Sequence, residues 1–525
     1  MDTFARERLP PKEQWPRLHF DLPELQYPAR LNCATVLLDD AIAEGHGDRT
    51  AILADEGAVS YRELLARANR IANVLVDLGV MPGNRVLLRG YNDVMLYAAW
   101  LAVMKAGAIA VTTMPMLRTL ELSAIMNKAR PAFALCDRRL VAELKAAADA
   151  TGALQTILSW GDGELEGRMA KAGDRFINVD TAADDVCLLA FTSGTTGQPK
   201  ACMHFHRDVL AMADVVARHL LRTQPDDIYA GSPPLGFTFG LGALLVFPLR
   251  FRAATVPIEA PAPATILAAI EKHGVTCLFT APFAYRALAN ELQGRDLSSL
   301  RRCVSAGEFL PQAVSDLWHE KTGIRIIDGI GATEMIHIFI SASGEEIRPG
   351  ATGKPLPGYR ACVLDEEGRE QPRGSTGRLA VTGPTGCRYL DDERQREYVQ
   401  QGWNVTGDLY RVDEDGYFWF VARADDMIVS AGYNIAGPEV EWALLAHPAV
   451  RECAVIGARD PERGIVVKAC IVLAPGRAPD LALVRELQDF VKQRIAPYKY
   501  PRLVEFVEAL PKTATGKLQR KVLRR

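Results

Sequence analysis

Along the first two thirds of the chain, short apolar runs alternate with longer segments in which apolar residues recur every three or four positions. The short runs are typical of buried strands, and the longer segments predict helices with one apolar face. Strands that alternate with helices of this length favour layered, parallel α/β structure. The predicted strands cover 51–54, 85–88, 108–111, 132–135, 186–191, 276–279, 300–304 and 324–327, and the predicted helices cover 64–78, 92–105, 121–128, 208–221, 264–272 and 312–321.

Polar residues mark the starts of two of these helices. Ser60 and Glu63 have the spacing of a capping box, in which each side chain binds the other residue's backbone N–H. Asn92 stands directly before an apolar segment, so the sequence predicts that Asn92 caps the next helix.

From about residue 350 the pattern changes to short strands, turns and glycines, which predicts a β-rich subdomain at about 350–424. Beyond it, alternating helices and strands predict a compact α+β unit at 425–525, of a size that can fold on its own. The predicted fold class is therefore α/β plus α+β. A large N-terminal domain of layered α/β subdomains and the β-rich subdomain covers 1–424, and a small domain follows.

Composition narrows the function classes. A formal net charge of -3 over 525 residues gives no basic footprint for nucleic acid. The ten cysteines are scattered without a CxxC pair, which suits reduced thiols and a cytoplasmic location. The most apolar window, 235–247, is too short to span a bilayer and is predicted to form a buried wall, so no membrane partner is expected. A monomer and a homodimer both remain open.

A loop rich in hydroxyls and glycines follows the predicted strand 186–191. Small residues let backbone N–H groups close on a ligand, and hydroxyls with one ammonium complete a cradle for phosphate oxygens. The spacing differs from that of the common P-loop. A flexible surface loop is the alternative, but it does not explain so many hydroxyls before a lysine. The predicted phosphate-binding residues are Thr192, Ser193, Gly194, Thr195, Thr196, Gly197 and Lys200.

Two further glycine-bearing segments follow apolar strands. Ser305–Glu308 comes after the strand at 300–304, and Asp328–Glu334 comes after the strand at 324–327. Ligands of open parallel sheets bind beyond the carboxyl ends of the strands. The sequence therefore predicts a ligand site that these three loops share.

Five motifs stand in a fixed order: Thr192–Lys200, Gly331–Glu334, Thr406–Asp408, Arg423–Asp425 and Pro511–Lys517. Together they resemble the adenylate-forming superfamily of acyl-CoA ligases, luciferases and peptide-synthetase adenylation domains, over nearly the whole chain. The resemblance implies an enzyme that uses ATP, Mg²⁺ and coenzyme A. It would join a carboxylate to the α-phosphate of ATP and then transfer the acyl group to a thiol.

The resemblance assigns the catalytic roles. Thr333 would contact the α-phosphate, and Glu334 with Thr196 would hold Mg²⁺, a hard cation that prefers oxygen ligands. Lys517 would be the catalytic lysine of adenylation. Taken alone, Glu334 could be a solvated loop acid, and Lys517 could belong to an ordinary basic tail.

The resemblance also assigns the nucleotide-binding residues. Asp408 would accept the ribose hydroxyls, supported by Arg423. Ile330 stands where the family often has a tyrosine, so the residue that stacks on adenine stays open. The segments beside adenine would be Ser305, Ala306, Gly307 and Glu308 with Asp328, Gly329, Ile330 and Gly331.

The small C-terminal domain would be mobile. In the family it turns about a hinge, here Asp425, between an adenylating pose and a thioester-forming pose. Gly432, Tyr433 and Lys499 would then line the coenzyme A tunnel.

The acid substrate is indicated by the wall near residues 234–242. No acidic residue occurs from 231 to 250, which argues against an α-amino acid because its ammonium would lack a partner. Phe237 and Phe239 suit a flat aromatic acid, although aromatic residues of an ordinary core are the alternative. The sequence most resembles the benzoate–CoA ligase branch and, within it, 2-aminobenzoate (anthranilate)–CoA ligases. The predicted pocket comprises Phe237, Thr238, Phe239, Gly240, Gly331 and His337.

The expected activity is ATP-dependent ligation of an aromatic acid to coenzyme A through an aryl-AMP, with 2-aminobenzoate favoured and benzoate or a substituted benzoate next. An enzyme that loads a carrier protein is the alternative, disfavoured because no carrier domain follows Arg525. A non-catalytic nucleotide-binding protein is a third class, and the presence of Lys517, Glu334 and Asp408 argues against it.

Overall fold

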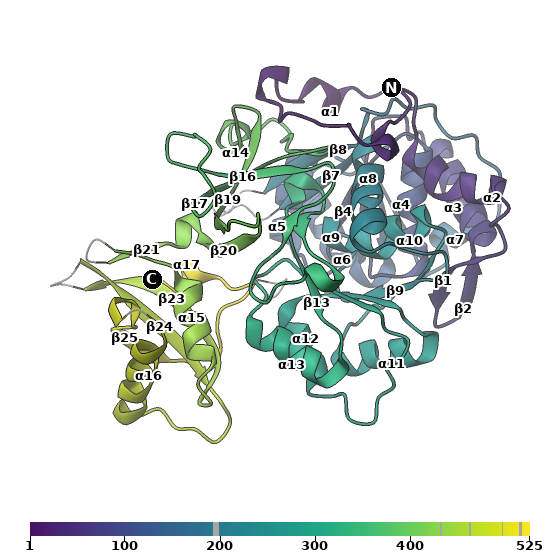
Figure 1. Cartoon of the computed structure of the whole chain (residues 1–525). Coiled ribbons are helices and arrows are strands. Elements are labelled where there is room, and N and C mark those ends of the chain that lie inside the picture. Colours follow the sequence, from purple (N-terminus) through teal and green to yellow (C-terminus); the bar gives the residue numbers. More distant parts are fainter. Residues whose placement is uncertain (193–198, 431–432, 461–463, 496, 514–516, 525) are drawn as a thin grey trace.

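The structure, a computed structural model, describes residues 1–192, 199–430, 433–460, 464–495, 497–513 and 517–524. Two large sheets form the body at the right of Figure 1, and a smaller unit of the last hundred or so residues lies at its lower left. The α/β plus α+β class is thereby confirmed.

The first large sheet has six strands, all parallel except the last pair. Its last pair, β7 and β8, brackets the predicted phosphate loop. In spatial order the strands are β6 (Thr156–Trp160), β5 (Phe133–Asp137), β3 (Arg85–Arg89), β4 (Ile109–Thr113), β7 (Val186–Thr192) and β8 (Lys200–Phe205).

The second large sheet has nine strands with a parallel centre and antiparallel edges. Two of the predicted ligand segments lie on its central strands. In spatial order the strands are β15 (Lys354–Pro355), β14 (Ile338–Ser341), β13 (Ile326–Gly331), β12 (Arg302–Ala306), β11 (Cys277–Thr280), β9 (Ile228–Gly231), β10 (Ala254–Val256), β1 (Thr50–Ala54) and β2 (Gly57–Ser60).

Helices cover the faces of these sheets and bury a large apolar core between them, with smaller separate cores on their outer faces. α4 is buried nearly all round, and a short helix near the amino terminus, α1, packs against the first sheet. The helices are α1 (Phe4–Glu7), α2 (Asp40–Ala43), α3 (Tyr61–Asp77), α4 (Val94–Lys105), α5 (Thr119–Ala129), α6 (Val141–Thr151), α7 (Glu164–Met169), α8 (His206–Met212), α9 (Thr238–Leu241), α10 (Phe247–Arg250), α11 (Pro263–His273), α12 (Pro282–Ala289) and α13 (Gln312–Thr322).

One helix start was predicted correctly and the other was not. Ser60 and Glu63 form the capping box of α3, as predicted. Asn92 does not cap α4; Asp93 does, since its carboxylate accepts a hydrogen bond from the Leu96 N–H at 2.7 Å. The Asn92 side chain instead bonds the backbone of the 233–235 loop, donating to Pro233 and accepting from Leu235.

Two further predictions need correction. The segment 328–331 is not a loop, because β13 continues through it: Gly329 and Gly331 still pair with β14. The predicted helix 208–221 begins at His206, and its second half, Ala213–Leu220, is wound as a π-helix. The apolar window 235–247 is helical, in short pieces, and its buried leucines confirm the predicted wall.

The β-rich region forms a five-stranded antiparallel sheet, drawn in green above the smaller unit in Figure 1. Its longest strand, β19, carries Asp408 and pairs with β20, which carries Arg423. The elements are β16 (Arg360–Leu364), β17 (Thr376–Thr382), α14 (Gln395–Tyr398), β18 (Val399–Gln400), β19 (Trp403–Val412) and β20 (Phe418–Arg423).

The smaller unit has its own apolar core between a three-stranded sheet and two helices. A hairpin, β21 with β22, lies beside it. The elements are β21 (Ile428–Ser430), β22 (Tyr433–Ile435), α15 (Gly437–Leu445), β23 (Val450–Asp460), β24 (Gly464–Leu473), α16 (Leu481–Arg494), β25 (Leu503–Phe506) and α17 (Arg520–Leu523).

Two global observations accompany the fold. All ten cysteines are buried as free thiols. Within the described part of the chain, no helix combines the length and apolar character that crossing a bilayer requires.

Candidate active site

The predicted phosphate loop leaves the first sheet at the β7–β8 hairpin. Thr192 and Lys200 are register partners across this antiparallel pair, so both borders of the loop are fixed by the ladder. Residues 193–198 lie outside the described residues, and with them Ser193, Gly194, Thr195, Thr196 and Gly197.

Lys200 reaches Glu334 through a tyrosine that the sequence analysis missed. The Lys200 ammonium donates a hydrogen bond to the Tyr389 hydroxyl at 3.2 Å, and that hydroxyl donates to Oε1 of Glu334. Burial, together with the Glu334 carboxylate, raises the pKa of Tyr389, so the phenol stays protonated and remains a donor. Tyr389 belongs to none of the five motifs, and no signal in its sequence neighbourhood marked it.

Thr333 is held in place by a second missed residue. Glu334 and Thr333 form a short 3₁₀ turn, Thr333–Met335, after β13. His204, fully buried, donates from Nε2 to the Thr333 carbonyl at 2.8 Å. Its other nitrogen lies 3.7 Å from the carboxylate of Asp208.

Asp208 is in turn paired with Arg388 at 2.9 Å, and both side chains are fully buried. Burial alone would raise the pKa of Asp208, but Arg388 and His204 lower it below the usual range. Because the removal of one partner from a buried ion pair leaves an uncompensated charge, this pair fixes α8, which carries Asp208, against the segment that carries Arg388 and Tyr389.

Two polar groups without partners lie side by side at the ends of β12 and β13. Ser305 and Asp328 are register partners, and Ser305 Oγ and Asp328 Oδ1 are buried without a hydrogen bond among the described residues. A buried polar atom without a hydrogen bond destabilises the fold unless a ligand or a water molecule bonds to it. A purine edge, with its amino donor and ring acceptors, fits this pair.

The other residues predicted beside adenine lie on the same two strands or directly after them. Ala306 ends β12, Gly307 follows with φ +90°, Glu308 is half-buried, and Gly329, Ile330 and Gly331 lie in β13.

Asp328→Asn is expected to raise the melting temperature more at pH 8 than at pH 5. Burial raises the pKa of Asp328 to about 7 from 3.8, so folding favours the neutral carboxyl group. The neutral Asp328 carboxyl group contributes its full stability at pH values below the pKa that Asp328 has in the unfolded chain. This contribution is lost as the pH rises through about 7. Asparagine keeps the shape without the charge. Thermal unfolding at the two pH values tests this, with exposed Asp149→Asn as control; equal gains at both pH values would contradict it.

The predicted ribose pair is formed by strand register. Asp408 and Arg423 lie opposite each other on β19 and β20, and the guanidinium donates to the Asp408 carboxylate at 2.8 Å. Asp408 is 8% exposed. A carboxylate that is buried and already supported by a cation is suited to accept two hydroxyl donors.

Lys517 extends from the smaller unit toward this cluster. The residue as a whole is exposed, but burial around its ammonium lowers its pKa, while the carboxylates of Glu308, Glu334 and Asp408 act to raise it. Burial raises the pKa of Glu308, and Lys517 partly offsets that effect. The structure thus brings the lysine of the last motif to the acids of the earlier ones.

Aromatic rings form the wall beyond β13. Phe239 contacts His337 at 5.6 Å between ring centroids, and Phe247 meets His337 edge-on at 4.7 Å. Phe279, at the end of β11, packs on both phenylalanines. Phe237 is half-buried before α9, while Thr238 and Gly240 are buried within it. Phe247 and Phe279 were missed because an aromatic residue in an apolar run gives no signal beyond core packing.

His337 is tightly enclosed and neutral. A Cβ at Gly242 would lie 2.5 Å from its ring, so only glycine fits there. The ring donates from Nε2 to the Phe239 carbonyl at 3.3 Å, and Nδ1 has no partner in the described chain. Burial lowers the pKa of His337 to about 3.

The residue before it, Ile336, has φ +64°, a conformation that a β-branched side chain rarely adopts. Gly331 lies so close that a Cβ there would come within 2.9 Å of the His337 backbone. Strain of this kind persists where the surrounding structure fixes it, and it clusters at functional sites.

Of the predicted hinge and tunnel residues, the structure describes the backbone of Asp425 and Tyr433 and the whole of Lys499. Asp425 belongs to a 3₁₀ turn, Ala424–Asp426, and its side chain, that of Tyr433 and all of Gly432 are outside the described set. Lys499 is half-buried and bonds both oxygens of Glu439 at 2.6 Å. The hairpin that carries Tyr433 includes β21, which lies at the far left of Figure 1, away from β13.

Comparison with known proteins identifies the family of the chain. The model of the AMP-binding enzyme family covers residues 39–388, and the model of the AMP-binding enzyme C-terminal domain covers 439–517. Benzoate–CoA ligase of Thauera aromatica is 36% identical over 515 residues, which are 96% of this chain and 97% of that protein.

Two solved structures share the whole fold. The anthranilate CoA ligase AuaEII in complex with anthranoyl-AMP superposes with a TM-score of 0.91 at 34% identity, over 96% of this chain and 98% of that one. A benzoate CoA ligase from Burkholderia xenovorans gives 0.87 at 31% identity, over 94% and 100%. The chain therefore belongs to the AMP-binding, adenylate-forming enzyme family, in the branch of the benzoate–CoA ligases.

Proposed function

We propose that this enzyme ligates 2-aminobenzoate to coenzyme A through an aryl-AMP intermediate, releasing AMP and pyrophosphate. Membership of the family makes it an AMP-forming acid–CoA ligase that uses ATP and coenzyme A. The choice of 2-aminobenzoate as the acid rests on a single observation. The aromatic wall contains the buried, neutral imidazole of His337, and the Nδ1 acceptor of this ring has no partner among the described residues.

The charge of the pocket supports an arylamine. An arylamine is neutral near pH 7 and needs an acceptor for its N–H rather than a carboxylate. Because Nε2 of His337 donates to Phe239, Nδ1 is the acceptor of the neutral ring. Thr238, buried on α9, is the alternative polar neighbour.

Mg²⁺ is part of the proposal, with Glu334 and Thr196 as its ligands. Glu334 fits a hard cation, because it is 8% exposed and only one of its carboxylate oxygens accepts a hydrogen bond from the described residues. A bound Mg²⁺ would neutralise phosphate charge. The protein contributes a fixed carboxylate, which Tyr389 orients.

Adenylation brings two anions together, so positioned cations carry the catalysis. We assign Lys200 to the outer phosphates and Lys517 to the substrate carboxylate and the α-phosphate. Thr333, whose carbonyl is tied to His204, would present its hydroxyl to the same phosphate. Asp408 and Arg423 would hold the ribose.

The second half-reaction requires Lys517 to leave. We propose that residues 425–525 turn as a domain on 1–424 about Asp425, since a hinge absorbs rotation in a few backbone dihedrals. The turn would bring Gly432, Tyr433 and Lys499 to the site as the coenzyme A tunnel. A cytoplasmic location, with ten free buried thiols, completes the proposal.

Parallel assays test the assignment. Pyrophosphate exchange should depend on an aromatic acid, and 2-aminobenzoate should exceed benzoate and ring-substituted benzoates in kcat/KM, with free coenzyme A as acceptor. If the enzyme is active only with a carrier protein, that protein and not coenzyme A is the acceptor of the acyl group. ATP binding without exchange would show that the protein is not catalytic.

Replacement of His337 by phenylalanine is expected to lower the kcat/KM ratio of 2-aminobenzoate to benzoate about tenfold, the value of one buried hydrogen bond. Benzoate turnover should change less, since the ring packing is kept. In the wild type the ratio should stay constant from pH 6 to 8, because the pKa of His337 is about 3. Thr238→Val is the matched control: a fall there, without one in His337→Phe, would move the contact to Thr238.

A further inference from the structure

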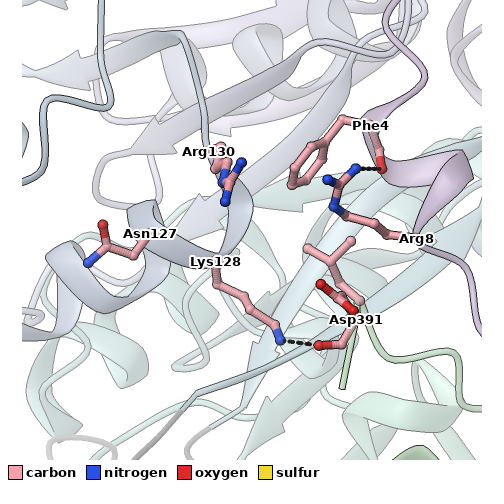
Figure 2. A pocket seen from close by; sticks show the side chains of 7 residues that line it. Phe4, Arg8, Asn127, Lys128, Arg130 and Asp391 are labelled. Atoms are coloured by element: carbon pink, nitrogen blue, oxygen red, sulfur yellow. Dashed lines mark hydrogen bonds between the residues drawn. The ribbon is translucent and has the colours of Figure 1, made fainter. Parts of the chain in front are cut away.

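A small cavity lies outside the active site, where three segments distant in sequence meet over one face of the first sheet. Figure 2 shows its lining: Phe4 and Arg8 from α1 and the residue after it, Lys128 and Arg130 from the end of α5, and Asp391. Its volume is about 90 Å³. The apolar base beneath it includes Ala5, Leu189 and Leu390.

The charges of the lining are unbalanced. Arg8, Lys128 and Arg130 face the single carboxylate of Asp391. Of the neighbouring charges, Arg85 is paired with Asp2, and Asp392 is shared between Arg394 at 2.6 Å and Lys128 at 3.6 Å. The cavity therefore carries a net charge of about two positive units, which an anion would neutralise.

Much of the donor capacity of these cations is unused. Arg8 donates to the Phe4 carbonyl at 3.2 Å, and Lys128 donates to the Asp391 carbonyl at 2.8 Å. The Arg130 guanidinium makes no hydrogen bond with the described residues. This guanidinium lies 5.7 Å from the centroid of the Phe4 ring, and the guanidinium groups of Arg8 and Arg85 lie over the same ring at 4.1 Å and 4.4 Å. Asp2 compensates the charge of Arg85, so an anion between Arg8 and Arg130 would relieve the repulsion that is left.

We propose that this cavity binds one inorganic phosphate dianion, held by Arg8, Lys128 and Arg130. A tetrahedral oxyanion matches the net charge of the lining, and the cavity has room for it but not for a nucleotide. The carboxyl end of α5 carries the partial negative charge of the helix dipole, and this charge repels the anion less than the three cations attract it.

Binding would join three segments of the chain. The phosphate would tie the amino-terminal helix to α5 and to Asp391, which has φ +46°, two residues after Tyr389. A ligand that binds only the folded chain raises its stability. Phosphate should therefore raise the melting temperature of the protein.

Calorimetric titration of the full-length protein with inorganic phosphate tests the proposal, with a saturating non-hydrolysable ATP analogue to fill both the nucleotide site and its outer-phosphate positions, and chloride at equal ionic strength as the salt control. The wild type should bind one phosphate. Arg8→Gln/Arg130→Gln should bind it at least about tenfold more weakly, the loss expected for charge-assisted hydrogen bonds. Arg168→Gln, on an exposed residue of α7, should bind as the wild type does.

Three outcomes would overturn it: no phosphate bound beside the ATP analogue, equal affinity in the double variant, or tighter binding of pyrophosphate with the analogue in place, which would mean that the site is not built for a single phosphate. Thermal unfolding of the double variant without phosphate separates a loss of binding from a loss of fold. Retained turnover with benzoate serves as a second control, since neither arginine lies in the active site.

Discussion

Lys517→Ala is expected to slow adenylation by about 10²–10³-fold, the loss typical of one positioned electrostatic group, while conversion of supplied aryl-AMP and coenzyme A to thioester continues. The charges of Glu308, Glu334 and Asp408 act on the lysine, yet it belongs to the smaller unit. We therefore expect it to assist adenylation only while that unit keeps the present pose. Pyrophosphate exchange measures the first half-reaction, and thioester formation from synthetic aryl-AMP measures the second.

Lys512→Ala is the matched control, because Lys512 lies in the same motif but is paired with Glu452 at 2.7 Å. It should leave both half-reactions within about twofold of the wild type, as expected for an exposed ion pair. An equal loss of both half-reactions in Lys517→Ala would contradict the alternation of domains.

The layered fold was predictable because burial imposes a period on the sequence. The central strands of the two large sheets are mostly apolar and buried, since helices cover both faces of each sheet, and these runs stand out between turn residues. Boundaries were less certain. β13 runs on through Gly329 and Gly331 because its backbone pairs on both sides, and pairing does not depend on the side chain.

The residues of the site that lie in contiguous motifs were predictable, whereas those that support them were not. His204, Asp208, Arg388 and Tyr389 reach Thr333 and Glu334 only through tertiary contacts across more than 50 positions of sequence. A buried His–Asp–Arg chain looks, in sequence, like three unrelated polar residues. Phe247 and Phe279 likewise become a wall only when two helices and a strand meet at His337.

These supporting residues explain how the site can be rigid around charged ligands. Tyr389 fixes the orientation of Glu334, and the Asp208–Arg388 pair fixes the segment that carries Tyr389. A carboxylate held in this way does not need to reorganise when the nucleotide binds, which is the condition for effective electrostatic catalysis.

Glu334→Gln should lower the rate of adenylation by about 10²–10³-fold and raise the Mg²⁺ concentration needed for half-maximal rate. The amide keeps the size of the side chain and an oxygen for the Tyr389 hydroxyl but removes the negative charge. Tyr389→Phe should cause a smaller loss, about tenfold, since it frees the carboxylate without removing it.

Pyrophosphate exchange at graded Mg²⁺ measures both effects, and Glu345→Gln, on an exposed residue of the same region, is the control. If Glu334 acts through its charge, thioester formation from supplied aryl-AMP should be nearly unchanged, because that step involves no pyrophosphate. A Glu334→Gln enzyme with an unchanged Mg²⁺ requirement would show that the carboxylate only orders its loop, and the cation would then need another ligand.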